Sequence, residues 1–354
     1  MRSSPILICT ASTHEDACIS TVIAAVEARG GQAIRLDTDL FPSATRLDLR
    51  FADGDRAALA VGGPAQEIDL ARIAAVWIRR MDPGVGLPAN LDPSYRDAAR
   101  VQAERTFWDL LECVDAFQLD PPECLLRAPG KARQLQLARA MGLAIPRTLI
   151  SNDARAVREF ASTCPGGLIV KVVDSSSLMQ QTDRGLQPVY ARRLTADDLA
   201  HMEGLELCPM IFQELVPKRL ELRITVVGSR VFTAALEPAP VEDGIIDVRQ
   251  MLGPERAFRA HADLPEDIQA GLLAMLDRLE LNFATFDVIL TPDGRHVFLE
   301  LNTVSYFDFV ERSAGLPISA AIADLLLGRV APRVARQGRQ PRASSLAAAA
   351  ARGV

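Results

Sequence analysis

The sequence predicts a mixed fold, with an α/β unit at the N-terminus and an α+β unit at the C-terminus. Near the N-terminus, apolar strand-like runs alternate with an amphipathic helix, a pattern typical of a parallel sheet. In the C-terminal half, strand-like runs follow one another across short turns, which is typical of antiparallel hairpins. The 354 residues are enough for two or three domains.

The first predicted unit covers residues 1–120. Its predicted elements are a buried-type strand over 5–10, a helix over 16–29 that Gly30-Gly31 ends, and strands over 32–37 and 74–79. Because strands and helix alternate, these strands are expected to form one small parallel sheet. Pro121-Pro122 marks the end of the unit.

The second predicted unit covers residues 121–208. Its predicted elements are a helix over 131–141 closed by Gly142-Leu143, a strand over 146–150, a helix capped by Asp153, and strands over 168–173 and 188–191. A polar loop over 174–185 separates the last two strands. Long polar loops between strands are often functional, so this one is predicted to be a mobile flap and the unit to be a lid.

The third predicted unit, residues 209–330, is rich in strands. Its predicted elements are strands over 210–216, 221–227 and 230–234, a helix over 265–279, a hairpin of strands over 286–290 and 297–302, and a closing helix over 317–327. The last 24 residues, 331–354, contain five arginines and no acidic residue, so they are predicted to be a disordered basic tail. Contact with a partner is the alternative for this tail.

Three polar residues interrupt the apolar C-terminal hairpin. Asp287 lies in the first strand, and Glu300 and Asn302 lie two residues apart in the second, so they share a face. If Asp293-Gly294 forms a two-residue loop, Asp287 pairs directly with Glu300, whereas an odd-numbered loop turns Asp287 to the opposite face. Two carboxylates and an amide would then suit Mg²⁺ with nucleotide phosphates. The alternative is a solvent-facing edge hairpin, although Asp and Asn are depleted in strands.

Two lysines are candidates for phosphate binding. Lys171 lies inside an apolar strand, where a lysine is costly to bury unless an anion such as a nucleotide phosphate meets it. The alternative is a lysine that snorkels from an edge strand. Lys131 opens a helix with an apolar face, and on its residues alone it is better explained as a solvated surface residue.

Charged residues on three strand-like segments are further candidates. Glu221 and Arg223 share a strand face, and Asp247 and Arg249 repeat that spacing. Arginines so placed can hold a carboxylate or a transferring phosphoryl group bidentately, with cross-strand ion pairing as the alternative. Glu214 lies where a strand ends, and the backbone there could hydrogen-bond a flat heterocycle.

The composition restricts the function classes. A net charge of −6 argues against nonspecific nucleic-acid binding, and no apolar run approaches the length of a membrane span. The six scattered cysteines fit a reduced, cytoplasmic protein. The sequence has no Walker P-loop, no Gly-x-Gly-x-x-Gly after a strand, no Gly-x-Ser-x-Gly elbow and no zinc spacing among its four histidines. Hydrolysis by a catalytic triad or by zinc is therefore not expected.

Taken together, these motifs resemble the ATP-grasp fold in order and spacing. They are Lys131, Lys171, Phe212-Gln213-Glu214, Glu221-Leu222-Arg223, and Asp287 followed by Glu300-x-Asn302. Three more resemble signatures of the microviridin-type ligases, which make graspetides, ribosomal peptides with ω-ester or ω-amide linkages. These are Arg35-Leu36-Asp37-Thr38-Asp39-x-Phe41-Pro42, Val76-Trp77-x-Arg79-Arg80 and Gly142-Leu143-x-Ile145-Pro146-x-Thr148. The resemblance covers roughly residues 5–327. Ribosomal-protein glutamate ligases share the C-terminal half but not the first two signatures.

The resemblance implies roles for the matching residues. Those implied to bind ATP are Lys131 and Lys171 at the phosphates, Gln213, Glu214, Leu215 and Val216 at the adenine, and Glu221 at the ribose. Those implied to hold Mg²⁺ are Asp287, Glu300 and Asn302. Arg223 and Arg249 would stabilise the phosphoryl group or the acyl phosphate.

Two segments depart from the family pattern. Thr303-Val304-Ser305 follows the metal asparagine, where many relatives have Pro and a Gly-containing turn. Asp174-Ser175-Ser176-Ser177 stands where the phosphate-covering loop of relatives is often glycine-rich. The first departure concerns the acceptor site, and the second concerns closure of the loop.

The implied reaction is an ADP-forming ligation. ATP phosphorylates an Asp or Glu side chain of a ribosomal precursor peptide, and a Ser/Thr hydroxyl or Lys amine of the same peptide attacks the acyl phosphate to close a macrocycle. The implied partner is this peptide, leader plus core, with the leader expected near residues 174–195. A homodimer is left open, and neither nucleic acid nor membrane is implied.

Two other functions stay open at this point. The first is a ligase for free amino acids or small metabolites with the same ATP site, of the ribosomal-protein glutamate ligase type. The second is a nucleotide-binding and peptide-binding partner protein without chemistry, which the departure at 303–305 motivates. A complete set of Asp287, Glu300 and Asn302 argues against the second, because a pure binder needs no complete metal site.

Overall fold

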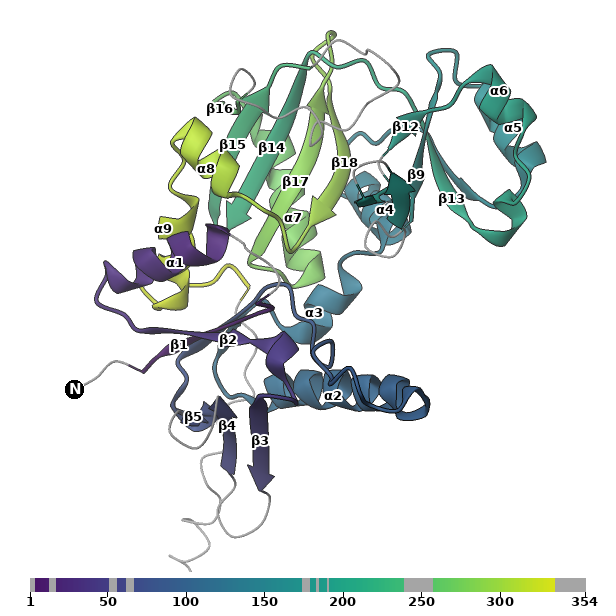
Figure 1. Cartoon of the computed structure of the whole chain (residues 1–354). Coiled ribbons are helices and arrows are strands. Elements are labelled where there is room, and N and C mark those ends of the chain that lie inside the picture. The colour runs from purple at the N-terminus through teal and green to yellow at the C-terminus, as the bar shows by residue number, and fades with distance from the viewer. Residues whose placement is uncertain are drawn as a thin grey trace, which may run out of the picture.

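Three main sheets follow one another along the chain in the computed structural model (Figure 1). The structure describes residues 4–12, 17–50, 56–61, 67–173, 179–182, 185–189, 191–238 and 257–334. A parallel sheet forms the N-terminal part, and the central and C-terminal sheets are antiparallel. The predicted combination of α/β and α+β architecture is confirmed. Every helix in these ranges is too short or too polar to cross a lipid bilayer.

The N-terminal sheet has four strands in the order β2-β1-β6-β7, and each neighbouring pair is parallel. Its elements are β1 (Ile6–Thr10), α1 (Ala17–Glu27), β2 (Ala33–Asp37), β6 (Ala75–Ile78) and β7 (Phe117–Leu119). All residues of β1 and β6 are buried, as expected for strands covered on both faces. The predicted parallel sheet is therefore confirmed, with β7 as an additional strand.

Several elements of the N-terminal part are not predicted by the sequence pattern. They are a small antiparallel sheet of β3 (Thr45–Arg50), β4 (Arg56–Val61) and β5 (Glu67–Asp69), the 3₁₀ turns η1 (Thr38–Leu40) and η2 (Leu70–Arg72), and the helices α2 (Pro93–Cys113) and α3 (Pro122–Arg127). The 21-residue α2 buries only four side chains, so its apolar periodicity is weak. Asp92 caps it by accepting a hydrogen bond from the Ser94 N–H.

The central sheet has the strand order β12-β9-β13-β8. The elements of this part are α4 (Lys131–Ala140), β8 (Thr148–Ser151), α5 (Ala154–Ser162), β9 (Leu168–Val172), β10 (Met179–Thr182), β11 (Gly185–Pro188), β12 (Arg192–Arg193), α6 (Ala196–Ala200), η3 (Leu205–Leu207) and β13 (Met210–Glu214). Since β13 pairs with both β8 and β9, the predicted boundary between residues 208 and 209 would divide this sheet.

Two predictions for the central part need correction. The continuous polar loop over 174–185 is wrong in part, because β10 and β11 form an antiparallel hairpin. The strand predicted over 188–191 is also displaced, since β11 ends at Pro188 and β12 begins at Arg192. Short strands of mostly polar residues resemble a loop in the sequence. The segment 174–178, with its three serines, lies outside the described residues.

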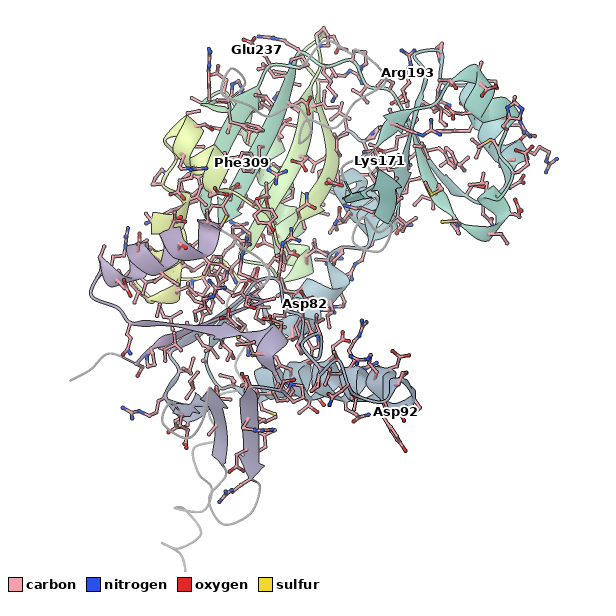
Figure 2. The ribbon with its side chains drawn as sticks, viewed as in Figure 1. Asp82, Asp92, Lys171, Arg193, Glu237 and Phe309 are labelled. Atoms are coloured by element: carbon pink, nitrogen blue, oxygen red, sulfur yellow. The ribbon has the colours of Figure 1, made fainter. Side chains whose placement is uncertain are left out.

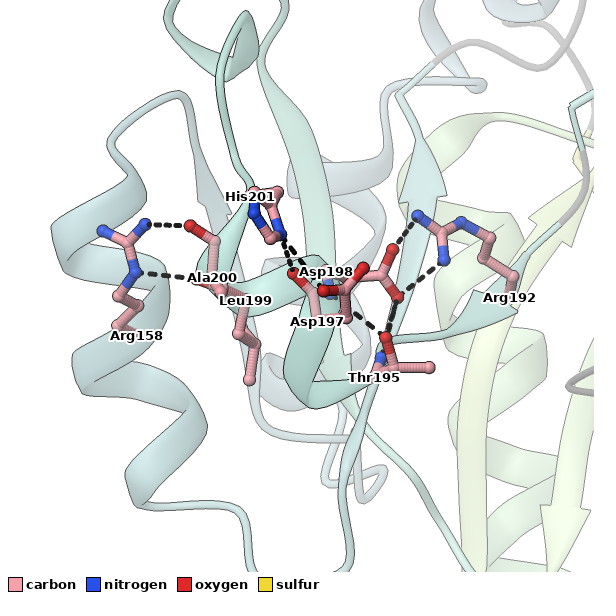
Figure 3. A network of polar contacts seen from close by, with 8 residues as sticks. All are labelled: Arg158, Arg192, Thr195, Asp197, Asp198, Leu199, Ala200 and His201. Atoms are coloured by element: carbon pink, nitrogen blue, oxygen red, sulfur yellow. Dashed lines mark hydrogen bonds and ion pairs between the residues drawn. The ribbon is translucent and has the colours of Figure 1, made fainter.

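A polar network fixes α6 to α5 and β12 (Figure 3). Thr195 and Asp198 form a capping box at the start of α6, and Arg192 binds the Asp198 carboxylate through both terminal nitrogens at 2.7 and 2.8 Å. The hydrogen bonds from Arg192 have the largest effect on the pKa of Asp198, and together with the Thr195 contacts they hold it well below its usual range. Arg158 of α5 donates to the carbonyls of Leu199 and Ala200. The network therefore holds α6 in place against α5 and β12.

The C-terminal sheet has five antiparallel strands in the order β16-β15-β14-β17-β18. The elements of this part are β14 (Leu220–Val227), β15 (Arg230–Leu236), β16 (Arg259–Ala260), α7 (Glu266–Leu279), β17 (Phe283–Leu290), β18 (His296–Asn302), α8 (Asp308–Ala314) and α9 (Ile318–Leu326). The predicted hairpin at Gly228-Ser229 and the helices predicted over 265–279 and 317–327 are confirmed.

In the hairpin of β17 and β18 the predicted loop is wrong, but the strand pairing predicted from it is correct. The last strand pair joins Leu290 to His296, so five residues connect the strands and the predicted two-residue loop at Asp293-Gly294 is wrong. A register shift between Asp287 and Val288 compensates by leaving one extra residue, Leu299, on β18. Asp287 therefore pairs with Glu300, as predicted. The odd loop and the bulge each move the register by one residue, and the two shifts cancel.

Two apolar cores join the N-terminal part to the C-terminal sheet. One contains side chains of the parallel sheet and α2 together with those of α7, β14 and β17. The other packs α1 against α9, which lie side by side in Figure 1. The start of the predicted disordered tail is also anchored, since Arg333 pairs with Asp277 and Val334 bonds Asn282. Residues 335–354 lie outside the described residues.

Asp120 links the parallel sheet to the start of β17. It follows β7 directly, is only 2% exposed, and accepts hydrogen bonds from the N–H groups of Asn282 at 2.8 Å and Phe283 at 2.9 Å. Burial raises the pKa of this carboxyl to about 7, although the two backbone bonds act in the opposite direction. The folded protein therefore holds a proton on Asp120 at a pH where the unfolded chain has lost it.

This shift predicts a pH-dependent contribution to stability. A carboxyl with a raised folded pKa stabilises the fold most at low pH, and that contribution is lost as pH rises toward about 7. Relative to the Asp120→Asn variant, the wild type should lose about 2 to 3 kcal/mol of unfolding free energy between about pH 5 and pH 8. Urea unfolding at each pH measures this difference. A difference that does not vary with pH would contradict the assignment.

Candidate active site

A cavity of about 580 Å³ lies between the central and C-terminal sheets. The central sheet contributes Ile169, Lys171, Ile211 and Gln213 to its lining, and the C-terminal sheet contributes Arg223, Asp287, Glu300 and Asn302. In the view of Figure 2, Lys171 and Phe309 lie at opposite sides of the strands β14, β17 and β18. Both residues line the cavity, so it extends from the central sheet to the segment that begins α8.

Three charged residues form one row across neighbouring strands of the C-terminal sheet. Arg223 of β14 pairs in register with Asp287 of β17, and Asp287 pairs in register with Glu300 of β18. The Arg223 guanidinium donates to Asp287 Oδ1 at 2.6 Å. The bulge at Leu299 breaks the alternation of β18, so the consecutive residues Leu299 and Glu300 both line the cavity. The row therefore presents two carboxylates and a guanidinium to the same space.

Asn302 completes the predicted oxygen cluster. Its side-chain amide donates to Asp287 Oδ2 and to Glu300 Oε1, both at 3.1 Å, so the three predicted metal residues converge. Across the described ranges, no group of three His, Cys, Asp or Glu side chains is arranged to hold a metal ion. Two carboxylates with an amide instead fit Mg²⁺, which is usually held by one or two carboxylates together with substrate phosphates. The residues present therefore fit a magnesium ion that arrives with a nucleotide.

Lys131 reaches this cluster from the first residue of α4. Its Nζ lies 2.7 Å from Glu300 Oε2, although the two residues are 169 positions apart. The buried Gln134, one turn further along α4, exchanges two hydrogen bonds with the backbone of Leu301 and so fixes α4 against β18. Burial alone would raise the pKa of Glu300, but the charges of Lys131 and Lys171 and the bonds to it keep that pKa below its usual range. Glu300 is therefore ionised.

Lys171 faces the cavity from β9. Desolvation lowers its pKa, and the carboxylates of Glu300 and Asp287 offset this only in part. It has no ion pair within 4.0 Å among the described residues, whereas Lys131 has one. A buried cation without a contact partner is unfavourable, and an anionic ligand would relieve the cost. The predicted position of Lys171 inside an apolar strand is confirmed.

The segment from Gln213 to Val216 lines the cavity where β13 ends. The Leu215 N–H donates to the Gly167 carbonyl, and the Glu214 carboxylate accepts from the Arg147 N–H. Two of the four residues therefore form hydrogen bonds within the central part. Gln213 Oε1 is buried and has no partner among the described residues. Apolar side chains surround this end, namely Ile169, Leu215, Val216, Ile289 and Leu299. An apolar slot with one unpaired acceptor, Gln213 Oε1, fits a flat heterocycle that carries an amino group.

Two site contacts were not found by reasoning from the sequence. Lys218 pairs with Glu221 at 3.0 Å, and Ser305 Oγ accepts a hydrogen bond from Arg223 at 2.6 Å. No sequence signal indicated Lys218, because it lies in the turn between β13 and β14, and a lysine in a turn is normally a surface residue. Glu221 and Arg223 both line the cavity, as their shared strand face predicts. Arg249 lies outside the described residues, so its predicted role stays a prediction.

The Trp77-x-Arg79-Arg80 signature contacts the segment that follows Asn302. Arg79 is 3% exposed, donates to the Ser305 carbonyl at 3.1 Å, and lies 5.1 Å from the Trp77 ring centroid. Arg80 lies 4.5 Å over the Tyr306 ring and lines the cavity. The N-terminal part therefore supplies one arginine that holds Ser305 in place and one that faces the cavity.

Comparisons with known proteins agree with this geometry. The family model of the MvdD pre-ATP grasp domain matches residues 5–125. The macrocyclase MdnC from Microcystis aeruginosa MRC, solved with the precursor peptide MdnA, is 35% identical with a TM-score of 0.82, covering 92% of this chain and 100% of that chain. A ribosomal-peptide-associated ATP-grasp ligase of Chryseobacterium gregarium, solved with ADP and leader and core peptide, is 28% identical with a TM-score of 0.85, covering 95% and 99%.

A more distant match is a probable alpha-L-glutamate ligase from Enterobacter sp. (strain 638). It is 25% identical over 230 residues, which cover 62% of this chain and 72% of that protein. The match is shorter than those to the two solved ligases, each of which this chain covers almost completely. The similarity is therefore more extensive to the ligases solved with peptides than to the glutamate ligase.

Proposed function

Because the chain belongs to the microviridin and graspetide family of ATP-grasp ligases, we propose that it closes macrocycles in a ribosomal precursor peptide. ATP would phosphorylate an Asp or Glu side chain of the peptide. A hydroxyl or amine of the same peptide would then attack the acyl phosphate, which releases phosphate and forms an ω-ester or ω-amide bond. The observation that carries the proposal is the row of Arg223, Asp287 and Glu300 in a cavity that also holds Lys131 and Lys171.

The cavity residues divide into a nucleotide end and a reacting end. The slot formed by Gln213 to Val216 would hold the adenine, with Gln213 Oε1 accepting from its amino group, and Glu221 would meet the ribose. Lys131 and Lys171 would bind the phosphates by charge-assisted hydrogen bonds. Arg223 is held by Asp287 and Ser305, so its guanidinium is already oriented toward the reacting groups. Arg249 would add a second guanidinium.

Asp287, Glu300 and Asn302 would hold Mg²⁺ with the nucleotide. When bound, the ion would neutralise charge on the phosphate oxygens during transfer. In the absence of nucleotide, Lys131 and Arg223 compensate the two carboxylates at 2.7 and 2.6 Å. These pairs hold both carboxylates in place before the ligands arrive.

The central sheet would act as a lid over this site. It covers one side of the cavity and has a small apolar core of its own, built around Val157, Val170 and Phe212. We place the end of this lid near Val216, because β13 belongs to its sheet. Closure would keep water away from the acyl phosphate, which otherwise hydrolyses. The leader peptide would dock near residues 174–195, which include the β10–β11 hairpin.

The test is a reconstitution with the peptide that is encoded beside this gene. The pure protein, ATP, Mg²⁺ and this peptide should give a peptide that has lost one water per ring, with one ADP released for each ring. Intact mass and ADP release measure the two quantities together, and mild alkaline hydrolysis then distinguishes esters from amides. Unchanged peptide mass with ADP released only after free amino acids are added would instead support a glutamate-ligase activity. No nucleotide turnover with either substrate would support a binding protein.

A further inference from the structure

Five cationic side chains line the cavity, and the described residues pair only three of them with a carboxylate. Lys131 pairs with Glu300, Lys218 with Glu221, and Arg223 with Asp287. The other two are Lys171 and Arg80. Nucleotide phosphates account for Lys171 in the proposed function. Arg80 has no such assignment, although it is half-buried and carries a full positive charge.

Arg80 differs from its neighbour Arg79 in what its guanidinium contacts. Arg79 uses its charge inside the protein, at the Ser305 carbonyl and between the Trp77 and Phe307 rings. Arg80 stacks on the Tyr306 ring at 4.5 Å, and its buried Nε has no hydrogen-bond partner among the described residues. A stacked guanidinium has lost part of its water shell and keeps a fixed orientation. It is therefore prepared to bind an anion in the cavity.

The position of Arg80 indicates which anion this is. It comes from the N-terminal part and contacts Tyr306, on the segment that leads from the metal asparagine to α8. Phe309, in the first turn of α8, lies across the strands β14, β17 and β18 from Lys171 in Figure 2. The phosphate-binding lysines lie on α4 and β9. Arg80 thus reaches the cavity from different elements than those lysines, and a planar guanidinium matches a carboxylate bidentately.

We propose that Arg80 binds the side-chain carboxylate of the peptide residue that is about to be phosphorylated. This inference rests on the proposed function and adds the residue that selects an acid over an amide. Arg80 would hold the carboxylate while one of its oxygens attacks the γ-phosphorus of ATP. A new oxygen–phosphorus bond forms as the bond from the γ-phosphorus to the bridging oxygen breaks, and ADP leaves with that electron pair. No proton moves to or from Arg80, because guanidinium stays protonated.

The decisive experiment is a double-mutant cycle with two peptides. The first is the precursor encoded beside this gene, and the second has its core Asp and Glu residues replaced by Asn and Gln. Binding of both is measured with saturating Mg²⁺-ADP, for wild type, Arg80→Gln and Arg80→Lys. Wild type should bind the acidic peptide at least about tenfold more tightly than the amide peptide. Arg80→Gln should abolish that preference, and Arg80→Lys should restore only part of it because lysine lacks the planar fork.

Three accompanying measurements separate the possible failures. Arg72→Gln removes the same charge from an exposed position of η2 and should keep the preference. Affinity for Mg²⁺-ADP and the unfolding temperature should stay close to wild type in Arg80→Gln. If the preference survives in Arg80→Gln, or if both peptides and Mg²⁺-ADP weaken equally, the inference is overturned and Arg80 only supports Tyr306. If the wild type neither prefers the acidic peptide nor cyclises it, the proposed function itself fails.

Discussion

Replacing Glu300 by alanine is expected to lower kcat for ATP-dependent ring formation by about a thousandfold or more. Glu300 accepts from Lys131 at 2.7 Å and from Asn302 at 3.1 Å, and it stands opposite Asp287 in the hairpin. Its loss would remove one of two carboxylates available to Mg²⁺ and leave the Lys131 ammonium without its partner. Charge that accumulates during phosphoryl transfer would then be poorly compensated.

Two comparison variants make this result specific. Glu300→Gln keeps the shape of the side chain and should be nearly as inactive, because the negative charge is the lost property. Glu104→Ala, on the exposed face of α2, should retain wild-type turnover. ADP release and peptide mass measure turnover, and thermal unfolding checks that each variant folds. Turnover within tenfold of wild type in Glu300→Ala would remove the metal-site assignment.

The hairpin that carries Glu300 shows how far the sequence determines the site. Polar residues within apolar strands indicated three residues that the structure brings together, because Asp and Asn in a strand need a local explanation. The predicted pairing of Asp287 with Glu300 was correct although the predicted loop was wrong, since the bulge at Leu299 offsets the five-residue connection. A β-bulge has no reliable pattern in one sequence, so this register could not be derived with certainty from the turn residues.

Contacts between distant elements were the main part that sequence patterns did not provide. On its residues alone Lys131 looked like a solvated surface residue at the start of a helix, and only the packing of Gln134 against Leu301 brings it to Glu300. The Arg79 and Arg80 signature had no physical role until the structure placed both residues beside Ser305 and Tyr306. The parallel strands, in contrast, were predictable because continuous apolar runs of β-branched residues bury both faces.

The cations of the site divide into those that have a carboxylate partner among the described residues and those that do not. Lys131, Lys218 and Arg223 each have a carboxylate within 3.0 Å, which offsets their charges before any substrate binds. Lys171 and Arg80 have no such partner among the described residues, and they line the cavity from β9 and from the segment after β6. Substitution of Lys171 should therefore change stability in the opposite direction to substitution of a paired cation. Removal of a paired cation leaves a carboxylate without its partner, whereas removal of Lys171 relieves a desolvated charge.

The Lys171→Met variant tests this difference most directly. Its affinity for Mg²⁺-ADP should fall about tenfold to a hundredfold, because a charge-assisted hydrogen bond to phosphate is lost. The same variant without ligand should unfold at a temperature about 2 °C above wild type, because methionine fills the space without a desolvated charge. A lysine with a lowered folded pKa destabilises the fold while it is protonated, and this cost disappears as pH rises through that pKa. The gain in stability should therefore shrink at alkaline pH.

Lys218→Met is the matched comparison, because it removes the same charge from the same cavity but leaves Glu221 without its 3.0 Å partner. It should unfold at a lower temperature than wild type, opposite to Lys171→Met. Titration calorimetry with Mg²⁺-ADP and thermal unfolding without ligand measure the two effects on each protein. If Lys171→Met lost stability as well as affinity, Lys171 would be a structural residue with a favourable environment in the empty site. If Lys171→Met left the affinity for Mg²⁺-ADP unchanged, the nucleotide phosphates would bind away from Lys171, because this lysine would then gain no anion from the ligand.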